Sequence, residues 1–176
     1  TDAVLTTVPV RGIYPYSVHS YSQVKPHLVF NSNDNKLYFP QQYGCEVRII
    51  DGNSNTVIGD ALLGGLPWAL AWNATSDKLY SLNQLGGYTS PGSISIIDGA
   101  SLQTVSTLTL GHYPSVMAWN RTNNTVFCAS AYSNDVRVVD GVTDQVIDTI
   151  AVGNYPVDVL WNPTGNKIYT ANENGN

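Results

Sequence analysis

Short hydrophobic segments separated by polar turn residues run along the whole chain. Between residues 115 and 150 the apolar segments are 115–119, 125–129, 136–139 and 146–150, with turns rich in Asn, Ser and Asp between them. Segments of this length, rich in Val, Ile, Tyr and Trp and spaced roughly 8–12 residues apart, are typical of antiparallel strands. No window combines a 3.6-residue period with helix caps. The pattern therefore predicts an all-β protein.

The turn residues recur at fixed places in a repeat. Pairs of Ile or Val precede an Asp-Gly dipeptide three times, at Asp51-Gly52, Asp98-Gly99 and Asp140-Gly141. A Gly-x-Tyr-Pro element occurs at 12–15, 111–114 and 153–156 and, shortened, at 65–67; it precedes Phe30-Asn31 or a Trp-Asn pair at 72–73, 119–120 and 161–162. Four strands in a repeat of about 42–47 residues correspond to one blade of a β-propeller.

The first apolar segment of each repeat supports this architecture. Residues 68–72 and 157–161 are apolar nearly throughout, whereas 136–138 alternates between apolar and polar side chains. A strand with one wet face should alternate, and a strand covered on both faces reads as a continuous apolar run. We therefore expect the first strand of each blade to be buried between neighbouring blades.

The order of residues resembles a known repeat. The last copy contains Trp161-Asn162-Pro163-Thr164, Lys167-Ile168-Tyr169 and Tyr169-Thr170-Ala171-Asn172. This order is similar to the YVTN β-propeller repeat of surface-layer-like and secreted proteins, with residues 169–172 at the naming tetrad. The second copy keeps Tyr80 and Asn83, whereas residues 38–41 and 127–130 depart from the tetrad. The resemblance covers essentially the whole chain and implies a β-propeller, but it does not specify a function, because functional sites are grafted onto folds.

The repeat also predicts the blade boundaries. Full blades are expected at about 13–60, 61–107 and 108–151, and residues 152–176 supply two strands of a fourth blade, which residues 1–12 or another chain would complete. Propellers close by covering their free strand edges. Three interpretations stay open: a segment of a longer or associated propeller, a symmetric dimeric ring, or a closed four-bladed monomer.

Composition narrows the function classes. The 176 residues include 8 Lys and Arg against 13 Asp and Glu, a net charge of −5, and only 12% of them are charged. An acidic chain without clustered cations argues against nucleic-acid binding. The sequence contains no run of 18 apolar residues, so it does not predict membrane insertion. The low charge and the many Asn and Thr residues suggest an extracellular or cell-surface protein.

The candidate metal and catalytic residues are few. Residues 51–55 (Asp-Gly-Asn-Ser-Asn) resemble the start of a calcium loop, but Thr56 and Leu62 stand where the loop needs Gly and Glu. Hairpin-turn chemistry explains the Asp-Gly pairs without a metal. His19, His27 and His112 have no cluster of acidic residues with metal spacing around them and are interpreted as surface residues. We therefore assign no catalytic residue, no metal ligand and no cofactor.

Two further residue types need an interpretation. Cys45 and Cys128 fall in the first and third blades, which are not neighbours, so we expect two thiols rather than a bridge within the chain; an intermolecular bridge is the alternative. Asn73, Asn120 and Asn123 begin Asn-x-Thr sequons. All three are expected in one exposed turn of successive blades.

Two insertions interrupt the repeat, at 16–25 and 84–93. Extra loops on a regular scaffold often carry binding residues. The sequence therefore marks a possible aromatic interaction surface made of Tyr14, Tyr16, Tyr21, Tyr88, Tyr113 and Tyr155. The alternative, which we favour, is that the Gly-x-Tyr-Pro tyrosines pack between blades.

Three functions remain in competition. The favoured one is a non-enzymatic structural or interaction scaffold that self-associates, or joins another propeller segment, through its blade edges. The second is an enzyme domain, such as a lactonase-like or quinoprotein-dehydrogenase-like propeller with a site at the central channel. The third is a fibre subunit in which residues 4–10 of one chain complete the edge of the next.

Overall fold

The computed structural model describes residues 7–8, 28–41, 44–87 and 89–174, and their regular structure consists of antiparallel strands. The first sheet contains β1 (Val29–Asn31), β2 (Lys36–Gln41), β3 (Glu46–Asp51) and β4 (Thr56–Leu62). The second contains β5 (Leu66–Asn73), β6 (Lys78–Gln84), β7 (Pro91–Asp98) and β8 (Thr104–His112). The third contains β9 (Pro114–Asn120), β10 (Thr125–Ser130), β11 (Asp135–Asp140) and β12 (Gln145–Ala151). The last contains β13 (Pro156–Asn162) and β14 (Lys167–Asn172).

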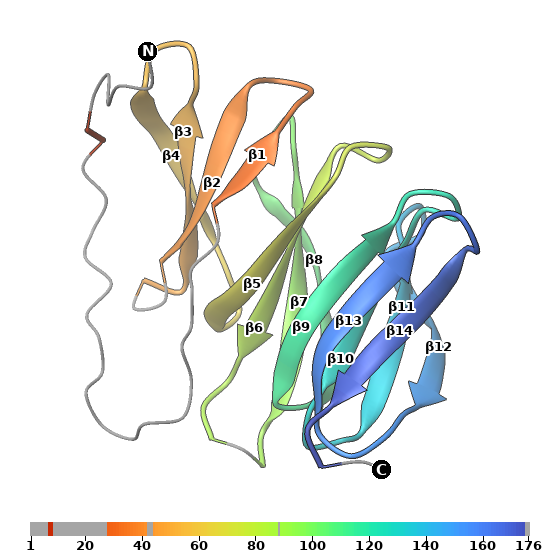
Figure 1. Ribbon diagram of the computed structural model, residues 1–176. Coiled ribbons are helices and arrows are strands. Elements are labelled where there is room, and N and C mark those ends of the chain that lie inside the picture. Colours follow the sequence, from red (N-terminus) through yellow and green to blue (C-terminus); the bar gives the residue numbers. More distant parts are fainter. Residues whose placement is uncertain (1–6, 9–27, 42–43, 88, 175–176) are drawn as a thin grey trace.

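Each sheet is a meander in which strands pair in chain order. Figure 1 shows the sheets side by side, from orange to blue, with β5, β9 and β13 at the front and β8 and β12 behind. The expected all-β fold of four-stranded antiparallel blades is confirmed, with three complete four-stranded sheets and a two-stranded one in the described residues.

Three hydrophobic layers hold the sheets face to face. The first layer joins Tyr38, Val47 and Ile49 of the first sheet to Leu70, Trp72 and Leu79 of the second. The second joins Tyr80, Leu82 and Ile94 to Val126, Cys128 and Val139 of the third sheet. The third joins Phe127, Ala129 and Val136 to Val159 and Ile168 of the last. Alternate residues of one strand therefore serve two different layers, as Leu79 and Tyr80 of β6 do. The second strands β6 and β10 are buried nearly throughout, whereas the first strand β9 is half-buried along most of its length. The expectation that the first strand is the enclosed one is therefore wrong for β9.

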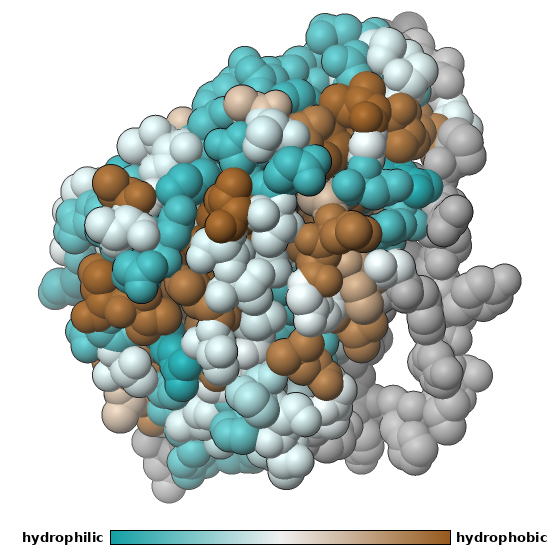
Figure 2. All heavy atoms as spheres, turned by 180° about the vertical axis from the view of Figure 1, so that it is seen from behind, coloured by the Kyte–Doolittle hydropathy of each residue, from teal (hydrophilic) through white to brown (hydrophobic). Residues whose placement is uncertain are grey.

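Two bulges recur in the blades and are not evident from the sequence pattern. On the outermost strands, Ile58, Val105 and Ile147 are the extra residues opposite the end of the third strand. On the innermost strands, Trp68, Ser115 and Val157 are the extra residues directly after the repeat proline. A bulge bends its strand and increases the local twist. Ile58, Val105 and Ile147 are also exposed, and Figure 2, seen from behind, shows hydrophobic side chains in separate groups among polar ones.

The predicted outermost strand at the start of the chain lies mostly outside the described residues. Of that segment only Thr7 and Val8 are described. Val8 lies against the first sheet, where it lines a hollow with Leu37 and Phe39 of β2 and with Ile50 of β3.

Candidate functional site

The Asp-Gly turns between the third and fourth strands are closed by side-chain caps. The Oδ1 atom of Asp140 accepts hydrogen bonds from the backbone N–H groups of Val142 and Thr143, at 2.9 and 2.7 Å, and from the Thr143 hydroxyl. Asp51 and Asp98 cap their turns in the same way. These bonds stabilise the ionised carboxylates and lower the pKa of all three aspartates. The calcium-like residues 51–55 thus form a capped turn.

The glycine of each Asp-Gly pair is required by a close backbone approach. The N–H groups of Gly52, Gly99 and Gly141 each donate a 2.8 Å hydrogen bond to a carbonyl oxygen in the neighbouring hairpin turn. A Cβ atom at these positions would lie 2.6–2.7 Å from the same oxygen atoms. Asp and Gly therefore recur together because one caps the turn and the other lets two turns touch.

The asparagine of each Trp-Asn pair has a double role. The Oδ1 atom of Asn73 accepts from the backbone N–H groups of Thr75 and Ser76, while its amide nitrogen donates to the Asn124 side chain of the next sheet at 2.7 Å. Asn120 does the same, with the Asn166 side chain as its partner in the last sheet, at 3.0 Å. Each of these asparagines thus ties its own hairpin to the following sheet.

This burial corrects one expectation for the sequons. Asn73 is fully buried and Asn120 is 2% exposed, so both amides are occupied inside the fold and are not in the exposed turn predicted for them. Asn123, in contrast, is exposed at the tip of its turn. The error arose because sequence position alone does not show which way a turn residue points.

Lysines form a second link between successive sheets. The Lys36 ammonium donates at 2.9 Å to the Gly99 carbonyl of the next sheet. The Lys78 ammonium donates at 3.3 Å to the Gly141 carbonyl and at 2.7 Å to the Asp144 carboxylate. A lysine at the start of the second strand therefore reaches the Asp-Gly turn of the following sheet in both cases.

Of the predicted tyrosine surface, the structure describes Tyr113 and Tyr155. Both are partly buried and both have left-handed backbone angles, with φ of 54° and 58°. Their rings lie edge-on to the Tyr132 ring, at centroid distances of 5.5 and 5.4 Å, and Trp68 lies 6.1 Å from Tyr113. Tyr14, Tyr16, Tyr21 and Tyr88 lie outside the described residues.

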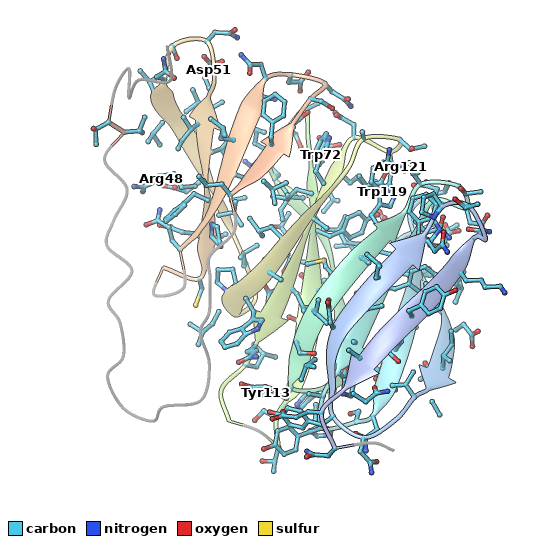
Figure 3. The ribbon with its side chains drawn as sticks, viewed as in Figure 1. Arg48, Asp51, Trp72, Tyr113, Trp119 and Arg121 are labelled. Carbon is cyan, nitrogen blue, oxygen red and sulfur yellow. The ribbon has the colours of Figure 1, made fainter. Side chains whose placement is uncertain are left out.

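Sequence reasoning missed Tyr132, the centre of this tyrosine row, because it belongs to no repeat motif. It lies in the turn after β10, where the Gly-x-Tyr-Pro elements on either side converge. Figure 3 shows Tyr113 at one end of the sheets and Asp51, Trp72 and Trp119 at the other. At that second end the Arg121 guanidinium lies 5.6 and 5.8 Å from the ring centres of Trp119 and Trp161, and so bridges the third and last sheets.

The cysteines and the described histidine do not form a catalytic or metal-binding cluster within the part of the chain that the structure describes. Cys128 is fully buried, and burial raises the pKa of its thiol to about 12, which makes it a poor nucleophile. Cys45 and Cys128 are both unbridged thiols. His112 is exposed and lies at the end of β8, and His19 and His27 fall outside the described residues. Across residues 7–8, 28–41, 44–87 and 89–174, no three His, Cys, Asp or Glu side chains are grouped to hold a metal ion.

The outward face of the last sheet, which we call the last-blade face, is the most distinctive exposed region. Tyr169 is 54% exposed, whereas the residues at the same repeat position, Tyr38, Tyr80 and Phe127, are 0%, 0% and 9% exposed. Leu160, on the neighbouring strand, is 64% exposed. The residue types of a blade-to-blade layer are thus present without a covering sheet in the described residues.

The opposite end of the row of sheets carries a second apolar surface, which we call the first-blade face. Leu28 and Phe30 are exposed on it, Leu37 and Phe39 are half-buried, and Ile50 is buried at its base, where Val8 also lies. Phe30 is 54% exposed, whereas Trp72, at the same repeat position, is 9% exposed. Part of the face forms an open apolar hollow of about 260 Å³.

Within the part of the chain that the structure describes, no helix is long and apolar enough to cross a membrane. No protein-family model matches the chain, and no curated protein matches it. Solved structures do resemble it. Kuenenia stuttgartiensis hydrazine synthase superposes with a TM-score of 0.72 at 21% identity, covering 91% of this chain and 45% of the other. A protein of unknown function from Desulfotomaculum acetoxidans gives 0.71 at 16% identity, covering 86% and 49%.

The chain therefore spans about half the length of these two structures. At such identities the likeness concerns the fold alone, and it agrees with the propeller-type blades of the chain.

Proposed function

We propose that this chain is a non-enzymatic scaffold of the YVTN propeller type, cell-surface or secreted, that assembles with another chain through its terminal blades. The observation that carries the proposal is the last-blade face, where Tyr169 is exposed although Tyr38, Tyr80 and Phe127 at the same position are buried. Leu160 beside it is also exposed, whereas Ala71 and Ala118 at its position are half-buried. Exposed apolar patches of this kind typically mark interaction sites.

The polar residues of the described blades support a structural role. Asp51, Asp98 and Asp140 cap turns, and Lys36 and Lys78 link sheets. Burial inside the layers raises the pKa of Tyr38 and Tyr80. Each of these side chains therefore has a role in holding the fold together, and no specific observation favours the enzymatic alternative.

The low charge supports the proposed location. Only 12% of the residues are charged, against about a quarter in a typical soluble domain. The YVTN-like order of residues adds to this, since the repeat is that of surface-layer-like and secreted proteins.

Light scattering coupled to size exclusion tests the proposal. We expect the wild type to show a mass above 19.1 kDa that rises with concentration, and Leu160→Asp to return it to the monomer mass. Val142→Asp is the matched control, because Val142 is 72% exposed in the turn between β11 and β12, away from the last-blade face. A wild-type mass of 19.1 kDa at every concentration would overturn the proposal.

A further inference from the structure

The lysine that links successive sheets is present a third time, on the last sheet. Lys36 and Lys78 begin β2 and β6, and each reaches the Asp-Gly turn of the sheet that follows it. Lys167 begins β14 in the same way and is exposed. The described residues contain no sheet beyond β14 for it to reach.

The asparagine link is also repeated on the last sheet. Asn73 and Asn120 donate to Asn124 and Asn166, the left-handed residues of the first hairpin turn in the following sheet. Asn162 occupies the same position, and its Oδ1 atom accepts from the backbone of Thr164 and Gly165 as its counterparts do. Its amide nitrogen thus stands where the other two reach across to the next sheet.

The first sheet carries the acceptors that these donors use. Gly52 follows Asp51 as Gly99 follows Asp98 and Gly141 follows Asp140. Asn55, with φ 56°, stands at the place of Asp144, the ion-pair partner of Lys78. Asn35, with φ 53°, stands at the place of Asn124 and Asn166.

The apolar surfaces match in the same order. In each internal junction, the large residue at the Tyr169 position packs against the following sheet, on the face that this sheet turns towards it. Tyr80 of the second sheet, for example, packs with Val126 and Val139 of the third. On the first sheet the residues at the positions of Val126 and Val139 are Leu37 and Ile50, and both line the open hollow of the first-blade face.

We infer that the last-blade face of one copy docks on the first-blade face of a second copy. In this head-to-tail junction Lys167 of one copy reaches the Gly52 carbonyl and the Asn55 side chain of its partner, and Tyr169 covers the hollow at Leu37 and Ile50. The inference rests on the proposed function and names its partner. Because the two faces differ, the contact is heterologous: it gives a closed ring if the rotation closes and a filament if it does not.

A charge introduced at Asn55 tests the junction directly. Asn55→Asp reproduces the Lys78–Asp144 pair, so we expect Lys167 of the second copy to bind it more tightly and the dissociation constant of the assembly to fall about two- to fivefold. The gain should shrink in high salt and disappear in the Lys167→Gln background. Lys167→Gln alone should weaken assembly about fivefold.

Asn53→Asp is the matched control, because it adds the same charge to the same turn and keeps the oxygen atom that accepts from Asn35. It should leave the dissociation constant unchanged. Equal effects of Asn55→Asp with and without Lys167, or no effect of Lys167→Gln, would overturn the inference. If Leu160→Asp disperses the assembly but Lys167→Gln and Asn55→Asp leave its dissociation constant unchanged, only the head-to-tail junction is overturned. A monomeric wild type would overturn the proposed function as well.

Discussion

The second and last sheets carry the same residue types at matching positions, but only one of them is enclosed. Tyr80 is fully buried and Lys78 bonds to the third sheet, whereas Tyr169 is 54% exposed and Lys167 lies on an open face. The difference cannot come from local sequence, because both strands begin Lys-Leu-Tyr or Lys-Ile-Tyr. It comes from the neighbouring sheet, so the repeat encodes one half of each junction and the next repeat supplies the other.

The largest expected contrast is between the two tyrosines. Tyr80→Ala should reduce the free energy of unfolding by about 3–5 kcal/mol, since it removes a large fully buried ring. Tyr169→Ala should cost about 0.5 kcal/mol or less in protein dilute enough to be monomeric. Urea unfolding followed by tryptophan fluorescence measures both. Equal losses would mean that the last-blade face is covered within one chain.

The capping asparagines give the next contrast. Asn73→Ala should lower the free energy of unfolding by about 2–3 kcal/mol, because it removes a turn cap and leaves the Asn124 Oδ1 atom without its donor, while the Asn124 amide nitrogen keeps its bond to Ser76. Asn162→Ala removes only the cap of its own turn and should cost about 1 kcal/mol. The same denaturation series provides the comparison. A larger loss at Asn162 than at Asn73 would contradict the cross-sheet role.

A smaller contrast is expected for the lysines. Lys78→Gln should reduce the free energy of unfolding by about 1 kcal/mol at low salt, because both members of its ion pair with Asp144 are largely buried. Lys167→Gln should leave the stability of the monomer unchanged. Thermal unfolding at low and high salt checks this: the Lys78 effect should shrink with salt, and a salt-independent loss would argue against the ion pair.

The smallest effect is expected from acid. The folded-state pKa of Asp51, Asp98 and Asp140 is below the ordinary 3.8, so their caps contribute stability that is fully present above about pH 5. That contribution is lost as the pH falls through 3.8 towards the folded pKa values. The side-chain amides of Asn73, Asn120 and Asn162 do not titrate, so the turns that they cap should not respond to acid in this way. As the pH is lowered to about 3, the protection of the Thr143 amide relative to its intrinsic exchange rate should therefore fall before that of the Thr122 amide, and a reversed order would contradict this assignment.

Much of the fold could be predicted from the sequence, because its signals are local. The apolar segments and the Asp-Gly, Trp-Asn and Gly-x-Tyr-Pro elements mark strands and turns within a few residues of themselves. Asp140 and Gly141 are examples: a capped tight turn needs these residue types whatever surrounds it.

The candidate site could not be predicted in the same way. The links from Asn73 to Asn124 and from Lys78 to Asp144 cross 51 and 66 residues and depend on how sheets stack. The bulges at Trp68 and Val157 shift the register of the inner strands; each follows the repeat proline, but the proline alone does not show that the next residue is unpaired. Tyr132 joins Tyr113 and Tyr155 only through the spatial meeting of three turns.

Hydrogen exchange of β14 as a function of protein concentration tests most directly whether a second copy covers the last-blade face. We expect the amides of Lys167–Asn172 to become more protected as the concentration of wild-type protein rises, and Leu160→Asp to abolish this dependence. The amides of β6, already enclosed at an internal junction, should not change. Exchange of β14 that is independent of concentration, in samples concentrated enough for assembly, would contradict the account.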